Sequence, residues 1–278
     1  MGRIENIDVF KNTERLCKTN KTLKEIMRET SYLQKVVLEK DELNVNKNIY
    51  DTPAKVIVSK KRSLEAAKAY KDNITCVLNF ASASNPGGGV LKGATAQEEA
   101  ICRCSTLYFH LSENDMWQKF YKPHREESNP LHNDDCIYTP DVMVVQSDTE
   151  TPEILEEKDW YSVNIITCAA PNLRANPSNA YNSGDGNTRP NISDKALLEL
   201  HKKRLKRILD IAIDNKNEII ILGAFGCGAF KNPPEIVAKA MKEITEEYKY
   251  AFKVIEYAVY CSSRDDRNYK CFERVFKN

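Results

Sequence analysis

Two adjacent carboxylates beside a run of glycines are the residues best suited to acid–base chemistry. The triple glycine at 87–89 is followed, after seven residues, by Gln97, Glu98 and Glu99. Consecutive glycines leave backbone amides uncovered and able to adopt positive φ, so such a loop can wrap closely around a phosphate or a sugar. A carboxylate beside that loop is suited to protonating a leaving oxygen or activating a water.

The helix that carries these glutamates is expected to start at Thr95. Thr95 and Glu98 have the spacing of a capping box, in which Glu98 bonds the Thr95 amide, so a purely structural role accounts for Glu98. Glu99 has no capping role and must be either solvated or functional. The helix dipole would lower the pKa of Glu99, whereas burial and the like charge of Glu98 would raise it, and the sequence leaves both outcomes open.

A second glycine loop lies in EIIILGAFGCGAFKNPPEIVAKAM, where a buried strand runs into a helix start at Asn232 and Pro233. A strand, a loop and a helix N-terminus in this order favour an anion site for a diphosphate. The loop is not a Walker motif, because Ala229 stands where a Lys should follow Gly228. It also reverses the spacing of the dinucleotide fingerprint. Phe225 and Phe230 are expected in the core, although one of them could close over a ribose.

Alternating β-branched runs and helical stretches predict an α/β layered domain with a mostly parallel or mixed sheet. The expected strands are 56–58, 74–80, 141–146, 162–170, 217–225 and 252–260, and the expected helices are 64–70, 96–110, 193–214, 233–249 and 267–276. Both glycine loops follow strands directly, at the carboxyl ends where ligands bind in such sheets. The polar segment 171–191 is longer than most connections and is either a lid or disordered.

Composition narrows the functional classes. The 278 residues include 41 Lys and Arg against 40 Asp and Glu, a net charge of +1 that argues against a broad nucleic-acid footprint. No apolar run approaches the ~18 residues of a membrane span, and the start lacks the pattern of a signal peptide, so a cytoplasmic protein is expected. The nine cysteines form no C-x-x-C pair and the four histidines are scattered. We expect reduced thiols, with Cys102 and Cys104 in the core, and no metal or cofactor.

NPGGG followed after seven residues by QEE resembles the signature of microbial-type poly(ADP-ribose) glycohydrolases, which are built on a macrodomain. The resemblance extends from LNFASASNPGGG through AQEEA to ILGAFGCGAFKNPP. It implies a three-layer α/β/α macrodomain with a mixed central sheet over residues 54–278. Residues 1–53, where Leu23, Ile26 and Met27 recur at helical spacing, are expected to form an N-terminal helical extension.

The resemblance also implies a site. ADP-ribose would lie in a cleft, with Glu99 as the catalytic acid and Glu98 holding ribose hydroxyls. The implied substrate contacts are Ser82, Asn85, Gly87, Gly88, Gly89, Val90, Gln97, Gly226, Cys227, Gly228, Ala229 and Phe230. Neighbouring glutamates cannot flank a sugar ring as the two carboxylates of most glycosidases do, at least ~5 Å apart, so one Glu would act first as acid and then as base.

The expected reaction is hydrolysis of ribose–ribose bonds in poly(ADP-ribose), from chain ends, with release of ADP-ribose. Two alternatives stay open: a hydrolase that removes single ADP-ribose units from protein or nucleic acid, and a module that binds ADP-ribose without cleaving anything. The expected partners are poly(ADP-ribose) or ADP-ribosylated proteins. No membrane and no sequence-specific nucleic-acid partner is expected, and the protein is expected to be a monomer.

Overall fold

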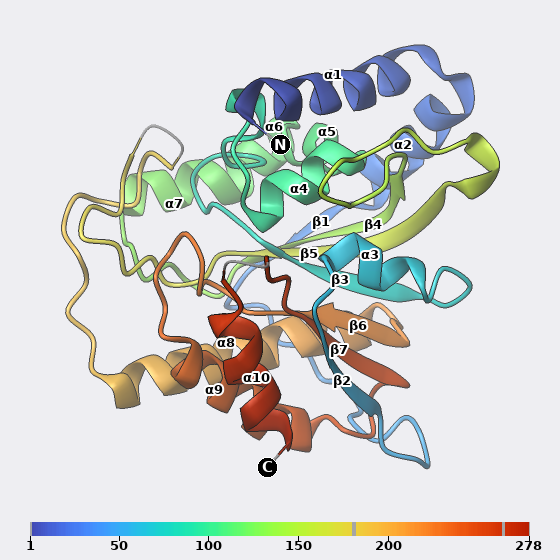
Figure 1. Cartoon of the computed structure of the whole chain (residues 1–278). Helices are drawn as coiled ribbons and strands as arrows, with labels where there is room; N and C mark the ends of the chain where they lie inside the picture. The colour runs from blue at the N-terminus through green and yellow to red at the C-terminus, as the bar shows by residue number, and fades with distance from the viewer. Residues whose placement is uncertain (1, 180–181, 263–264, 278) are drawn as a thin grey trace.

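A seven-stranded mixed sheet forms the centre of the molecule (Figure 1). The computed structural model describes residues 2–179, 182–262 and 265–277. The strands are β1 Lys35–Val37, β2 Lys55–Ser59, β3 Thr75–Phe80, β4 Cys136–Val144, β5 Tyr161–Cys168, β6 Ile219–Leu222 and β7 Val254–Ala258, in the order β1-β4-β5-β3-β6-β7-β2. The pairs β1–β4 and β4–β5 are antiparallel and the other pairs are parallel, which confirms the predicted mixed sheet.

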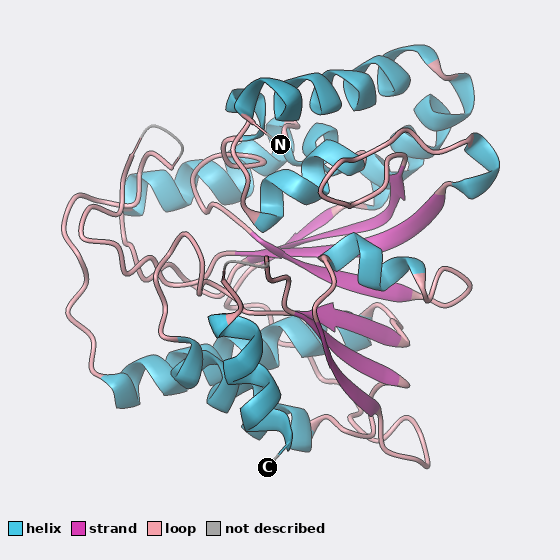
Figure 2. Cartoon of the chain, viewed as in Figure 1, coloured by secondary structure: helices cyan, strands magenta, loops and turns pink. Residues whose placement is uncertain are grey.

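Helices cover both faces of this sheet (Figure 2). They are α1 Arg3–Thr19, α2 Lys21–Leu33, α3 Ser63–Lys68, α4 Gln97–Cys104, α5 Leu107–Leu111, α6 Asn114–Met116, a π-helical turn Trp117–Tyr121, α7 Lys122–Glu127, α8 Asp194–Asp214, α9 Pro234–Glu247 and α10 Arg267–Lys277, with short 3-10 turns at Val90–Lys92 and Glu157–Asp159. Alternate residues of β3 point into two separate cores: Cys76 and Leu78 pack with α8 and α9, and Val77 packs with α3, α4 and α5. The predicted α/β/α layering is therefore confirmed.

The helix expected over 96–110 is two helices. α4 ends at Cys104, and Ser105 adopts an extended conformation and bridges to Val144 in β4 before α5 begins. The helical segments from Asn114 to Glu127 were not predicted. The interruption matters for the site because α4 alone carries the two glutamates.

Residues 1–53 were expected to form a helical extension, but they are only partly helical, because β1 joins the sheet antiparallel to β4, with Lys35 opposite Tyr138. The two helices before it match the expectation, and α1 packs on the segment that leads into α4. Asn6 Nδ2 donates to the Gly93 carbonyl at 3.0 Å, and Thr13 Oγ1 donates to the Arg103 carbonyl at 2.5 Å. The N-terminal segment thus braces the helix that carries the glutamates.

Arg204 joins its own helix, α8, to two loops of the sheet. Its guanidinium is 1% exposed and donates to Asp134 Oδ1 and the Ala169 carbonyl, both at 2.8 Å. It also donates to the Leu131 and His132 carbonyls, at 3.1 and 3.2 Å. One buried cation therefore fixes the end of β5 and the loop before β4.

Arg204→Met is expected to lower the free energy of unfolding by about 3–5 kcal/mol, because it leaves a buried carboxylate without its main partner. Lys203 Nζ, at 2.9 Å from Asp134, is too exposed to replace it. Urea unfolding followed by circular dichroism measures the change, with Lys203→Met as the control. A loss below about 1 kcal/mol, or an equal loss in the control, would contradict this assignment.

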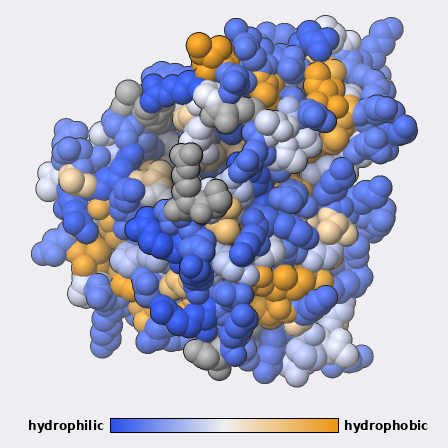
Figure 3. Space-filling view, viewed as in Figure 1, coloured by the Kyte–Doolittle hydropathy of each residue, from blue (hydrophilic) through white to orange (hydrophobic). Residues whose placement is uncertain are grey.

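The surface is largely hydrophilic on the face drawn in Figure 3, with separate apolar groups. Within the described chain, no helix has the length and apolar character that crossing a membrane requires. All nine cysteines are free thiols, and Cys102 and Cys104 are fully buried, as expected.

Candidate active site

The first glycine loop lies directly on the two glutamates. Gly87 and Gly88 have φ of 64° and 58°, in the left-handed region that favours glycine. A Cβ at Gly88 would lie 2.6 Å from Glu99 Oε1 and 3.0 Å from Glu98 Oε2. The loop backbone therefore approaches the carboxylates more closely than any side chain permits.

Glu99 is buried, with 6% of its surface exposed. The Gly89 amide donates to its Oε1 at 2.9 Å. Its Oε2 is equally buried yet has no hydrogen-bond partner in the described part of the chain. Burial raises the pKa of Glu99 above its ordinary value, and the Gly89 amide opposes part of that shift. A buried carboxyl with one anchored and one unpartnered oxygen is suited to exchanging a proton with a ligand.

Glu98 is held on both oxygens. The Ser82 amide donates to Oε2 at 2.8 Å and Asn79 Nδ2 donates to Oε1 at 3.3 Å. The expected capping box is therefore wrong: the helix N-cap is Ala96, and Glu98 turns inward to the end of β3 instead of back to Thr95. Burial, followed by the neighbouring charge of Glu99, raises the pKa of Glu98 well above its ordinary value.

The second glycine loop is built around Asn232. Its Nδ2 donates to the Gly226 carbonyl at 3.1 Å and to the Pro171 carbonyl at 2.7 Å. Gly226 has φ 76°, and a Cβ there would lie 2.5 Å from Asn232 Nδ2 and 2.6 Å from Ala170 Cβ. The following helix, α9, begins at Pro234 with Pro233 as its N-cap, close to the predicted start.

The amides of this loop differ in what they bond. Those of Gly226, Gly228 and Ala229 donate to no protein acceptor among the described residues, and Gly228 and Ala229 are exposed. The Cys227 amide, in contrast, donates to the Ala224 carbonyl at 3.0 Å, and its side chain lines a different cleft, beside Lys231. Three of the four expected anion contacts thus have a free donor, and Cys227 does not.

A cleft of about 450 Å³ lies between α4 and the second loop. Of the predicted residues, Gln97, Gly226, Gly228, Ala229 and Phe230 line it. Each polar atom of Gln97 is bonded within the protein, since Nε2 donates to the Leu78 carbonyl and Oε1 accepts from the Phe80 amide. Gln97 therefore lines the cleft but braces α4 on β3.

The remaining predicted residues lie behind the cleft lining. Glu98, Glu99, Gly87 and Gly89 are buried and Gly88 is half-buried. The Ser82 and Asn85 side chains contact the polar segment 171–191. For Val90 the structure does not support the expected substrate contact. Its side chain is fully buried in the core with α4 and α5, and its amide donates to the Gly87 carbonyl.

Sequence reasoning missed the opposite end of the cleft. Arg62 lies over the Tyr260 ring, 4.1 Å from its centroid, and 3.9 Å from Asp148. These three residues and Asn268 line the cleft. Arg62 and Tyr260 follow β2 and β7 directly, so the rule that ligands bind at strand ends would have indicated them. Among the described residues, no group of three or more His, Cys, Asp or Glu could hold a metal ion.

A mixed sheet covered on both faces, with a cleft between α4 and a glycine loop at the end of a strand, defines a macrodomain-like α/β domain. A family model described as microbial-type PARG, catalytic domain, matches residues 4–147, more than half of the chain. The chain belongs to the microbial-type poly(ADP-ribose) glycohydrolase family. No curated protein sequence matches it.

Solved structures agree with this assignment. Poly(ADP-ribose) glycohydrolase from Thermomonospora curvata superposes with a TM-score of 0.81 at 25% identity, covering 98% of this chain and 99% of that one. The enzyme from Deinococcus radiodurans, in complex with ADP-ribose, gives a TM-score of 0.78 at 27% identity, with coverage of 90% and 96%. The T. curvata enzyme bound to the inhibitor ADP-HPD shares the fold, with a TM-score of 0.79 at 24% identity and coverage of 97% and 98%.

Proposed function

We propose that this protein hydrolyses ribose–ribose bonds of poly(ADP-ribose) from chain ends and releases ADP-ribose, with Glu99 as general acid and base. Family membership supports the reaction, and one observation carries the residue assignment. Glu99 is buried beside the glycine loop with Oε1 anchored by the Gly89 amide and Oε2 unpartnered. The raised pKa favours the protonated carboxyl that an acid needs.

In this mechanism Glu99 protonates the leaving 2′-oxygen as the glycosidic bond breaks. An oxocarbenium-like ribose forms, and the resulting carboxylate takes a proton from the attacking water. Glu98 is the less suitable acid, because the Ser82 amide and Asn79 Nδ2 already occupy both of its oxygens. We assign it to binding ribose hydroxyls and to keeping the loop closed against α4.

The second loop is assigned to the diphosphate. The unpartnered amides of Gly226, Gly228 and Ala229 present positive dipoles to an anion. Phe230, which lines the cleft, would cover the terminal ribose, and the adenosine would extend toward Arg62 and Tyr260. The bound diphosphate would also help to stabilise the cationic transition state.

The two parts of the chain have different proposed roles. Residues 54–278 would carry the substrate site, and residues 1–53 would support it through α1 and β1. We also propose a monomer that works in the cytoplasm, where nine unpaired cysteines remain reduced.

The proposal is tested by product analysis on two defined substrates, a protein carrying poly(ADP-ribose) chains and the same protein carrying single ADP-ribose units. We expect release from chains to be roughly tenfold faster or more, with ADP-ribose as the first product instead of oligomers. Faster release from single units would make the protein a mono-ADP-ribosyl hydrolase. Tight ADP-ribose binding in calorimetry without any product would make it a binding module.

A further inference from the structure

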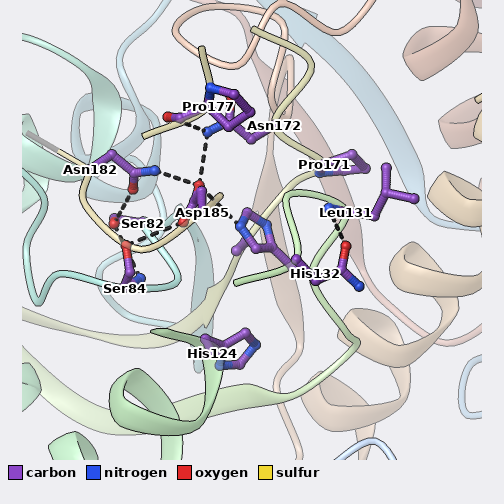
Figure 4. A network of polar contacts seen from close by, with 12 residues as sticks. Ser82, Ser84, His124, Leu131, His132, Pro171, Asn172, Pro177, Asn182 and Asp185 are labelled. Carbon is purple, nitrogen blue, oxygen red and sulfur yellow. Dashed lines mark hydrogen bonds and ion pairs between the residues drawn. The ribbon is translucent and has the colours of Figure 1, made fainter. Parts of the chain in front are cut away.

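A buried carboxylate in the polar loop, residues 171–191, lies at the centre of a hydrogen-bond network (Figure 4). Ala180 and Tyr181 of this loop lie outside the described residues. Asp185 is 1% exposed. Its Oδ1 accepts from Ser84 Oγ at 3.2 Å, its Oδ2 accepts from Asn172 Nδ2 at 2.8 Å and from Asn182 Nδ2, and His132 Nε2 lies 3.2 Å from the same oxygen.

These partners keep Asp185 charged. Burial alone would raise the pKa of Asp185, but hydrogen bonding and charge from His132, with the amides of Asn172 and Asn182, outweigh it and hold the pKa below its ordinary value. His132 Nδ1 lies 2.9 Å from the Ala170 carbonyl, a contact that holds the ring beside Asp185. An ionised carboxylate is costly to bury. Here the amides of Asn172 and Asn182 offset the cost from within the polar loop, and Ser84 Oγ offsets it from the catalytic loop.

The network reaches the catalytic loop through Ser82. Ser82 Oγ donates to Asn182 Oδ1 and accepts from the Asn85 amide at 3.1 Å and the Ser84 amide at 3.3 Å. The amide of the same Ser82 donates to Glu98 Oε2 at 2.8 Å. Asp185 is therefore connected to the Glu98 carboxyl through Asn182 and one serine.

We propose that Asp185 is a positioning residue for the reaction: it fixes the turn of residues 82–85 so that the Ser82 amide meets the Glu98 carboxyl. The inference rests on the proposed function, because it assigns Asp185 a role in the same chemistry. Asp185 itself touches neither glutamate. It acts by holding Ser84 directly and Ser82 through Asn182, and a loop shift of about 1 Å at this distance is sufficient to misplace a catalytic group.

Three single variants separate positioning from general stability. Asp185→Asn removes the charge and keeps the shape. Ser84→Ala removes the one direct bond between the carboxylate and the catalytic loop. Asn172→Ala removes an equally buried bond to the same carboxylate from within the polar loop, so it is the matched control. For each variant, kcat and KM on poly(ADP-ribose) and the melting temperature are measured beside the wild-type protein.

We expect Asp185→Asn to lower kcat about 10- to 100-fold with KM within about threefold, and Ser84→Ala to lower it several-fold. Asn172→Ala should keep kcat within about threefold even if its melting temperature falls. In a Glu98→Gln background, Asp185→Asn should cost little further, because both changes act through one carboxyl.

Two results would overturn the inference. One is an active wild-type protein whose Asp185→Asn variant retains its kcat. The other is a loss of kcat that follows the melting temperature equally in Ser84→Ala and Asn172→Ala. If Asp185→Asn does not fold, Ser84→Ala decides between a positioning role and a role in general stability. A wild-type protein that releases no ADP-ribose refutes the proposed function, and the inference fails with it.

Discussion

Glu99→Gln is expected to lower the rate of ADP-ribose release by about 10²- to 10⁴-fold while ADP-ribose affinity stays within a few-fold. The amide keeps the shape of the side chain and its contact with the Gly89 amide, but it cannot deliver a proton to the leaving oxygen. Single-turnover release from poly(ADP-ribose), with calorimetry of ADP-ribose binding, measures the two quantities. Turnover within a few-fold of the wild type would refute the assignment of Glu99.

Glu98→Gln is the matched control for this variant. Because Glu98 Oε1 and Oε2 both accept hydrogen bonds, the new amide group must face either the Ser82 amide or Asn79 Nδ2, and one bond is lost. We therefore expect a rise in KM with a smaller loss of kcat than in Glu99→Gln. Equal losses of kcat in both variants would mean that the pair acts as a unit.

The thermal stability of Glu99→Gln should equal or exceed that of the wild type at neutral pH. Burial raises the pKa of Glu99 in the folded state, so ionisation above the unfolded pKa disfavours folding, and the disadvantage disappears in acid. Glutamine carries no such cost. A clear fall in melting temperature would show that the loss of activity reflects misfolding instead of chemistry.

Gly88→Ala is expected to lower kcat about 100-fold or more, with normal secondary structure. The new Cβ would lie 2.6 Å from Glu99 Oε1, so either the loop or the carboxyl must move. Alanine at φ 58° adds about 1–2 kcal/mol of backbone strain. The measurement is kcat on poly(ADP-ribose), together with urea unfolding.

Gly93→Ala separates the two effects in Gly88→Ala. Gly93 has a similar φ of 70°, but its Cβ would meet the backbone of Arg3 in α1 and neither glutamate. We expect comparable or greater destabilisation with kcat within about tenfold of the wild type. If Gly93→Ala loses as much kcat as Gly88→Ala, strain in the loop, not displacement of a carboxyl, explains both.

Much of the fold could be predicted because its signals are local. The run IIIL is apolar on both faces and ends at a glycine loop. This pattern alone predicts a buried strand with a ligand-binding loop at its end. The strand KVV at 35–37 gave no such signal, because three residues that directly follow a charged helix acquire strand geometry only by pairing with β4. Tertiary contacts, not the local sequence, therefore determine that this segment is a strand.

The site was predictable to the level of loops but not of single atoms. The spacing of Thr95 and Glu98 indicated a cap, and the competing donors, Asn79 and the Ser82 amide, lie elsewhere in the chain. Val90 and Cys227 stand within the correct loops, yet the packing of one side chain and the bonded amide of the other remove them from the cleft. The network around Asp185 joins residues about 50 to 100 positions apart, which no local pattern records.

The pairing of β2 with β7 has a consequence for how the chain reaches this structure. Lys55 pairs with Val254, so an edge strand formed early in synthesis has no partner until almost all of the protein has been made. Closing a loop of this length is slow, and the exposed strand is a site for pairing with other chains in the meantime. The centre of the sheet, β3 with β5, can assemble earlier, so the wall of the cleft that carries Arg62 and Tyr260 is completed last.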